Sequence, residues 1–129
     1  MLLNIYTIAF IKDILIKCKN ICFGVVPSKV TGVTVSVTSN QPPLHVTWSA
    51  PSSDRTIQHY QVDYRVVTSG SWSRWSSNPT STSVTLTGLQ RGTTYQVRVR
   101  AVSDVGSGAW SNTVSRTTYD GKLFEIMTD

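Results

Sequence analysis

The segment from Leu89 to Ser111, LQRGTTYQVRVRAVSDVGSGAWS, constrains the fold of this chain more than any other. From Tyr95 to Ala101 apolar and polar residues alternate, and a period of two places them on opposite faces of a β-strand. One face holds Tyr95, Val97, Val99 and Ala101, and the other holds Gln96, Arg98, Arg100 and Val102. One buried and one solvated face are typical of a strand in a β-sandwich layer. Gly106 and Gly108 then predict a hairpin loop, after which Trp110 begins another strand.

The chain is long enough for a single domain. It has 129 residues, 40% hydrophobic and 15% charged, so a core can form and overall disorder is not expected. Between Pro27 and Tyr119 there are eight Lys or Arg against three Asp, a net charge of +5 (8 − 3). Spread cations of this kind chiefly keep a domain soluble, and they permit weak polyanion binding. The clustered basic stripe of a nucleic-acid binder is missing, so no nucleic-acid partner is predicted.

Residues 1–26 differ in composition from the rest, being rich in Ile, Leu and Lys and poor in Ser and Thr. The uncharged start, residues 1–11, is shorter than the roughly 20 apolar residues that span a bilayer, and signal-peptide features are weak. We interpret residues 1–26 as a leader that is a weak signal or anchor, a disordered or marginally helical segment, or sequence not native to the domain. Cys18 and Cys22 lie within it and are too few for a closed zinc site.

The remaining sequence predicts an all-β, seven-stranded sandwich over residues 27–118 and a tail or linker over residues 119–129. Short runs rich in Val, Thr and aromatic residues are separated by Pro and Gly, and no helix-length apolar stripe follows Pro27. In the second strand, alternation buries Trp48 and exposes His45. The seven predicted strands contain residues 33–37, 44–49, 57–66, 72–75, 84–86, 95–102 and 110–118.

Several motifs in a fixed order carry a family resemblance. Pro27 opens the first strand, PPLHVTWSAP holds Trp48, IQHYQVDYR holds Tyr60, and LTGLQRGTTYQVRVRAV holds Leu89 and Tyr95. Together these motifs resemble the fibronectin type III family over about residues 27–118. An antibody-type domain would instead need an inter-sheet Cys pair and a Trp on the third strand. The resemblance implies an immunoglobulin-like sandwich.

The same resemblance assigns structural roles to Trp48, Tyr60, Leu89 and Tyr95. In a tyrosine corner the Tyr95 ring fills the core and its hydroxyl bonds to backbone a few residues upstream. Leu89 would pack beneath this corner. Replacing Trp48 or Tyr95 by Ala is expected to cost about 3–5 kcal/mol of a total near 5–15 kcal/mol.

The string WSRWS, from Trp72 to Ser76, matches the Trp-Ser-x-Trp-Ser signature of class I cytokine receptors. In those receptors the signature lies between the sixth and seventh strands, whereas here it follows the third. The corresponding position here keeps only Trp110 and Ser111. A cytokine-receptor-like domain is therefore a minor alternative.

Outward arginines and nearby tryptophans suggest a candidate interaction face. Two arginines point outward from the Tyr95 strand and a third from its expected neighbour, and each stack of a guanidinium on an indole contributes about 0.5–1 kcal/mol. We predict that these groups interleave as an Arg/Trp ladder. The alternative is that the tryptophans merely cover sheet edges. The candidate residues are Arg65, Trp72, Trp75, Arg98, Arg100 and Trp110.

No catalytic, cofactor or metal site is predicted. His45 and His59 are isolated, apart from Asp63 near His59, and no nucleophile motif or phosphate-binding glycine loop is present. The loop after the Tyr95 strand holds no Arg-Gly-Asp sequence. The chain is therefore not expected to be an enzyme.

By resemblance, the chain is expected to be a protein-interaction or spacer module of an extracellular or cell-surface adhesion or receptor protein. Its partners are then proteins, and it meets a membrane only through other parts of a parent protein. The alternative is an ectodomain module of a larger enzyme, of the receptor tyrosine phosphatase or kinase type, with catalysis outside this chain.

Overall fold

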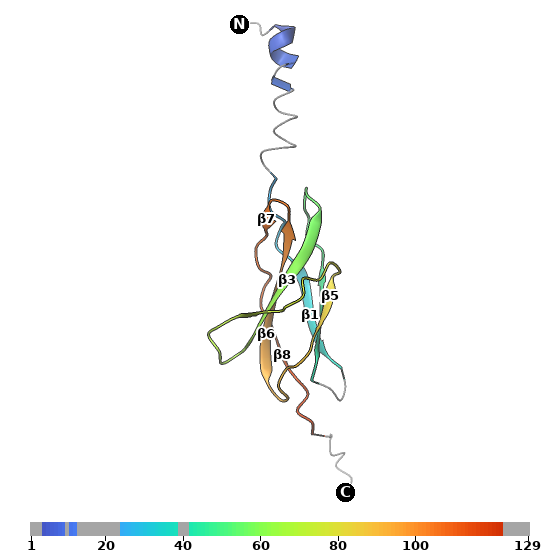
Figure 1. Cartoon of the computed structure of the whole chain (residues 1–129), viewed down its shortest axis with the longest axis vertical. Helices are drawn as coiled ribbons and strands as arrows, with labels where there is room; N and C mark the ends of the chain where they lie inside the picture. The colour runs from blue at the N-terminus through green and yellow to red at the C-terminus, as the bar shows by residue number, and fades with distance from the viewer. Residues whose placement is uncertain (1–3, 10, 13–23, 39–41, 123–129) are drawn as a thin grey trace.

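The computed structural model describes residues 4–9, 11, 12, 24–38 and 42–122. Over these ranges two antiparallel sheets pack face to face, as Figure 1 shows. The first sheet has the order β1-β2-β5, with bounds Thr31–Val37, Leu44–Ser49 and Ser83–Leu86. The second has the order β4-β3-β6, with bounds Ser73–Arg74, Ile57–Val66 and Thr94–Ser103. Two short strands, β7 (Gly106–Ser107) and β8 (Val114–Thr117), both pair with β6. The predicted all-β sandwich is confirmed.

The last strand differs from the prediction of one continuous strand over residues 110–118. The segment between β7 and β8 follows β6 with only occasional backbone bonds, from Gly108 N to the Ala101 carbonyl and from Ser111 N to the Val99 carbonyl, both 2.8 Å. A Cβ atom at Gly108 would collide with the Pro27 carbonyl, so glycine allows this segment to approach the start of the sandwich closely.

The core lies between the two sheets and follows the alternation of the sequence. Every second residue of β6 is buried, and its inward residues face those of β3, with Val99 opposite Val62 and Ala101 opposite Tyr60. The Trp48 and Tyr60 rings meet edge to face, 5.2 Å between centroids, and burial raises the pKa of the Tyr60 hydroxyl. The buried apolar residues are Val30, Val35, Leu44, Val46, Trp48, Tyr60, Val62, Leu86, Leu89, Tyr95, Val97, Val99 and Ala101.

The structure contains a tyrosine corner at the start of β6. Tyr95 is buried, and its hydroxyl oxygen accepts a hydrogen bond of 3.0 Å from the backbone N–H of Gln90. Leu89 is buried beside it, and Gly88 takes a positive φ of 72° that favours glycine at this turn. The bond therefore ties the chain that enters β6 to the core side chain of the same strand.

Part of the predicted leader is helical. Residues 5–9, 11 and 12 adopt helical conformation, and the Asn4 side-chain oxygen accepts a bond of 2.8 Å from Thr7 N, as an N-cap does. None of the helical residues described forms a segment long and apolar enough to cross a membrane. Cys18, Cys22 and the tail from residue 123 lie outside the described residues.

We expect Tyr95→Phe to lower the free energy of unfolding by about 1–2 kcal/mol, because the part-buried Gln90 amide loses its acceptor. Urea unfolding measures the loss. Tyr119→Phe is the matched control, since the Tyr119 hydroxyl bonds to the Lys122 carbonyl at an exposed site and its loss should change stability by less than about 0.5 kcal/mol. Equal effects of the two substitutions would show that the corner bond contributes nothing specific.

Candidate interaction face

The outer face of the β3-β6 pair is built from polar cross-strand pairs. The antiparallel register places Gln61 opposite Arg100, Asp63 opposite Arg98, and Arg65 opposite Gln96. In each pair an arginine donates to an oxygen of the residue it faces, with distances of 2.8, 3.1 and 2.8 Å in that order. Directly opposed side chains in an antiparallel sheet are close enough for such bonds. Register alone therefore supplies each of these arginines with an acceptor.

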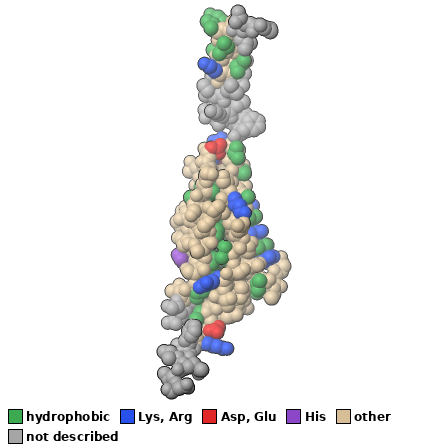
Figure 2. Space-filling model, turned by 180° about the vertical axis from the view of Figure 1, so that it is seen from behind, with side chains coloured by type: hydrophobic (Ala, Val, Ile, Leu, Met, Phe, Trp, Pro, Cys, Tyr) green, Lys and Arg blue, Asp and Glu red, His purple; other side chains and the backbone are tan. Residues whose placement is uncertain are grey.

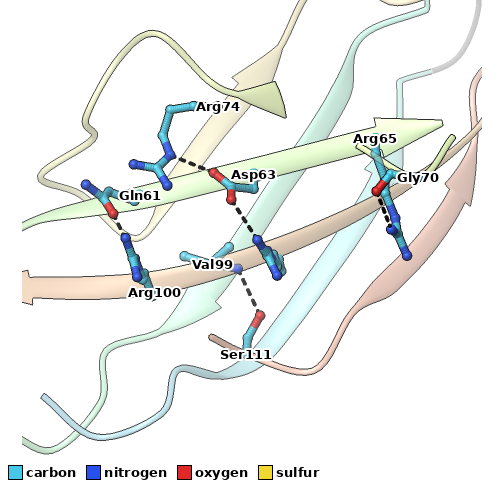
Figure 3. A network of polar contacts seen from close by, with 9 residues as sticks. Gln61, Asp63, Arg65, Gly70, Arg74, Val99, Arg100 and Ser111 are labelled. Carbon is cyan, nitrogen blue, oxygen red and sulfur yellow. Dashed lines mark hydrogen bonds and ion pairs between the residues drawn. The ribbon is translucent and has the colours of Figure 1, made fainter. Parts of the chain in front are cut away.

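Asp63 is the buried charge at the centre of this face, with 4% of its surface exposed. Its two oxygens accept from Arg74 Nε at 2.6 Å and from an Arg98 terminal nitrogen at 3.1 Å (Figure 3). A buried carboxylate is costly unless it is paired and hydrogen-bonded, and two charge-assisted bonds offset that cost. Asp63 thus joins the edge strand β4 to the central strand β6.

The Arg/Trp ladder is present as an alternating row. The guanidinium carbon of Arg98 lies 4.2 Å from the ring centroid of Trp72 and 4.2 Å from that of Trp110. Arg65 lies 4.4 Å from Trp72, and Arg100 lies 4.4 Å from Trp110. We use the name Arg/Trp ladder for these five residues, in the order Arg65, Trp72, Arg98, Trp110, Arg100.

Arg98 is held at the centre of the Arg/Trp ladder. Its Nε is buried and has no hydrogen-bond partner among the residues that the structure describes, and its guanidinium lies against two indole rings. The negative faces of the indoles attract the cation where water is excluded, a contribution of up to about 2 kcal/mol per contact. The stacking therefore replaces part of the solvation that Arg98 loses.

Trp75 does not join the Arg/Trp ladder, contrary to its place among the candidate residues. It lies three positions after Trp72, and an odd spacing along an extended segment points the two rings to opposite faces of the sheet. Trp75 packs at the border of the core, with its ring edge to face with Tyr64 at 6.1 Å. Of the two tryptophans in WSRWS, one therefore serves the outer face and the other the interior.

Two neighbours of the Arg/Trp ladder were not among the candidate residues. Arg74, two positions after Trp72 and on the same face, contacts Asp63 and lies 5.6 Å from the Trp110 centroid. Ser111 places Trp110: its Oγ accepts from Val99 N at 2.9 Å and donates to the Asn112 carbonyl at 3.0 Å (Figure 3). The signal for Arg74 was its alternation with Trp72. Nothing in the sequence distinguishes the bonding role of Ser111 from that of other serines.

This face is strongly positive. It holds Arg65, Arg74, Arg98 and Arg100, and Asp63 pairs with only two of them, Arg74 and Arg98. Burial lowers the pKa of Arg100, and the positive charges of Arg74 and Arg98 lower it further. Figure 2 shows Lys and Arg side chains interspersed with hydrophobic ones along one edge of the sandwich, with little acidic surface in view.

Of the two histidines weighed above, His45 lies apart from this face, whereas His59 lies on β3 opposite Val102. His45 bonds through Nδ1 to the Thr85 hydroxyl at 3.1 Å on the β2-β5 pair. Within the described ranges, no three His, Cys, Asp or Glu side chains are grouped so as to hold a metal ion. The Arg/Trp ladder and its neighbours therefore remain the candidate site.

These features define an immunoglobulin-like β-sandwich with a tyrosine corner and one cation-rich outer face. A sequence model of the fibronectin type III domain matches residues 28–117. The chain belongs to the fibronectin type III family, which confirms the resemblance. Domains of this family are non-catalytic modules that generally mediate contacts between proteins.

Similar proteins come from several kinds of larger chain. Human Brother of CDO is 33% identical over 106 residues, covering 77% of this chain and 9% of that protein. Receptor-type tyrosine-protein phosphatase F of Danio rerio is 37% identical over 94 residues, covering 70% of this chain and 4% of that protein. A crystal structure of domains from titin superposes with a TM-score of 0.68 at 29% identity, covering 74% of this chain and 33% of that one. This chain thus spans less than a tenth of the length of those two relatives.

We expect Asp63→Asn to lower the free energy of unfolding by about 2–4 kcal/mol, since Arg74 and Arg98 lose the charge that pairs them at a buried site. Urea unfolding at low salt and at about 1 M NaCl measures the loss, which should largely survive screening. Asp104→Asn is the control, because its 3.5 Å pair with Arg55 is exposed and should contribute less than about 0.5 kcal/mol. Comparable losses would contradict a central role for Asp63.

We expect Arg98→Lys to lower the free energy of unfolding by about 1–3 kcal/mol, although the charge is kept. A lysine ammonium has no planar group to lie against two indoles, so both stacks weaken. Thermal unfolding measures the loss, and the near-ultraviolet circular dichroism of the tryptophans should change with it. Arg116→Lys, at an exposed position outside the Arg/Trp ladder, should leave both readouts unchanged. A wild-type spectrum for the Arg98 variant would argue against the stacking.

Proposed function

We propose that this chain is a non-catalytic protein-interaction module of an adhesion or receptor protein at the cell surface. In this proposal the Arg/Trp ladder and Arg74 form the surface that contacts the partner. The observation that supports it most is the concentration of arginine and tryptophan on one outer sheet face. These two residue types are enriched among the residues that contribute most to protein interfaces.

Preorganisation of the face supports the same proposal. Arg65, Arg98 and Arg100 are each held by a hydrogen bond to the opposite strand and by contact with an indole. Side chains that are already ordered lose less conformational entropy when a partner binds. A positive surface also accelerates encounter with an acidic partner.

The cell-surface location is supported by the names of similar proteins, which include a receptor-type phosphatase and human integrin beta-4, the latter 38% identical over 66 residues. The likeness to receptor-type tyrosine-protein phosphatase F favours a second candidate role, as one ectodomain module of a larger receptor enzyme. The complete transcript distinguishes the two, because only the second requires a membrane span followed by a catalytic domain.

We expect beads coated with this chain to bind intact cells that carry the partner, and Arg65→Gln/Arg100→Gln to reduce that binding by about 10-fold or more. The two arginines lie at the ends of the Arg/Trp ladder, so the core is untouched. Flow cytometry counts the bound beads, and circular dichroism verifies that the variant is folded.

The matched control is Arg91→Gln/Arg116→Gln, which removes the same charge from two exposed positions outside the Arg/Trp ladder. It should bind cells as the unmodified chain does. Undiminished binding by the folded Arg65→Gln/Arg100→Gln chain would reject this face as the contact surface. An equal loss of cell binding with both double variants would show that net charge alone causes the effect.

A further inference from the structure

One end of the Arg/Trp ladder carries more positive charge than its own residues neutralise. Three guanidinium carbons surround the Trp110 ring, those of Arg98 at 4.2 Å, Arg100 at 4.4 Å and Arg74 at 5.6 Å. The one carboxylate bonded to this group is Asp63, whose two oxygens are taken by Arg74 and Arg98. Among the residues that the structure describes, Arg100 donates only to the neutral side chain of Gln61.

Several hydrogen-bond donors at this end of the Arg/Trp ladder also have no partner among the described residues. Arg74 and Arg100 each donate through Nε, and their terminal nitrogens have no partner among the residues described. The Arg74 side chain is 44% exposed, and Figure 3 shows its guanidinium on the Gln61 and Arg100 side of Asp63. Two forked donor groups thus face solvent beside one indole ring.

We propose that Arg74 and Arg100, which lie beside the half-buried Trp110 ring, form a binding site for a carboxylate from an acidic segment of a protein partner. The planar fork of a guanidinium matches the two oxygens of a carboxylate, and Nε is already engaged, so the terminal nitrogens remain to donate. This inference rests on the proposed function for the choice of a protein partner.

Charge in the site supports anion binding. Burial lowers the pKa of Arg100 most, and the positive charges of Arg74 and Arg98 lower it further while the charge of Asp63 raises it. An incoming anion would act in the same direction as Asp63 and relieve the repulsion among the arginines. Arg100 nevertheless stays charged near neutral pH, because the ordinary pKa of an arginine lies far above neutrality.

The distribution of free donors favours a compact carboxylate over a sulfated polymer. A polymer of sulfates needs a run of available cations along its path. At the other end, Arg65 already donates to Gln96 at 2.8 Å and to the Gly70 carbonyl at 3.4 Å. The central Arg98 is bonded to Asp63 and 24% exposed. Donors without a partner among the described residues are therefore most numerous at the Trp110 end, where Arg74 and Arg100 each bond through Nε alone.

The test uses the full chain and a capped hexaglutamate peptide at low ionic strength, with binding followed by isothermal titration and by the indole N–H signal of Trp110. We expect the peptide to bind and to shift the Trp110 signal. Arg100→Gln should weaken binding by about 10-fold, and Arg100→Lys, which keeps the charge but loses the fork, by about threefold. Arg116→Gln, the charge-matched control, should change affinity by less than twofold.

Three outcomes would overturn the carboxylate site. One is no binding, another is an equal loss with Arg116→Gln, and the third is tighter binding of a heparin-derived hexasaccharide that also depends on Arg65. If the peptide fails to bind while Arg65→Gln/Arg100→Gln still abolishes attachment to cells, the carboxylate site is wrong and the proposed function stands. If the peptide binds as expected and attachment is unaffected, the proposed function is wrong.

Discussion

The antiparallel register between β3 and β6 is the constraint on which the rest of this structure depends. On the inner face it sets Val62 against Val99, and on the outer face it sets Asp63 against Arg98. A slip of one residue would turn the Arg98 face into the core and the Val99 face to water. The hydrophobic core and the Arg/Trp ladder are therefore two consequences of one pairing.

The outer face of the β3-β6 pair contains buried charged groups that would destabilise the domain and contacts that offset this effect. Asp63 is a buried charge, and Arg98 loses water at Nε, so each would destabilise the domain alone. Their mutual bond, with Arg74 and the two indoles, compensates both. Because Arg74 comes from β4 and Trp110 from the segment before β8, the same contacts hold both flanks of the sheet to its centre.

The sequence predicts most of this arrangement because alternation is a local property. The inward set on β6, the burial of Trp48 and the outward direction of Arg98 all follow from a period of two. The sequence does not predict which of Trp72 and Trp75 points to the outer face. That depends on how the two-residue strand β4 is oriented after the preceding turn. Asp63 was assigned no role because its partners, Arg74 and Arg98, are chosen by register, which is long-range. The hydrogen bonds of the Ser111 side chain depend on where the segment after β7 stops pairing regularly with β6. No residue pattern in the sequence marks that point.

Within the positive face, the arginines divide by what they already bind. Arg98 is bonded to Asp63, lies against an indole ring on each side and is mostly covered, so its interactions stabilise the fold. Arg65 is partly committed through Gln96 and Gly70. The terminal nitrogens of Arg74 and Arg100 have no partner among the described residues, and they lie beside Trp110. A ligand gains most binding free energy from donors that are already ordered but have no partner. Ordered side chains lose little conformational entropy on binding, and unpaired donors can still form hydrogen bonds with the ligand. In the proposed function, recognition therefore concentrates at the Trp110 end of this face, while the remainder of the Arg/Trp ladder keeps those donors in place.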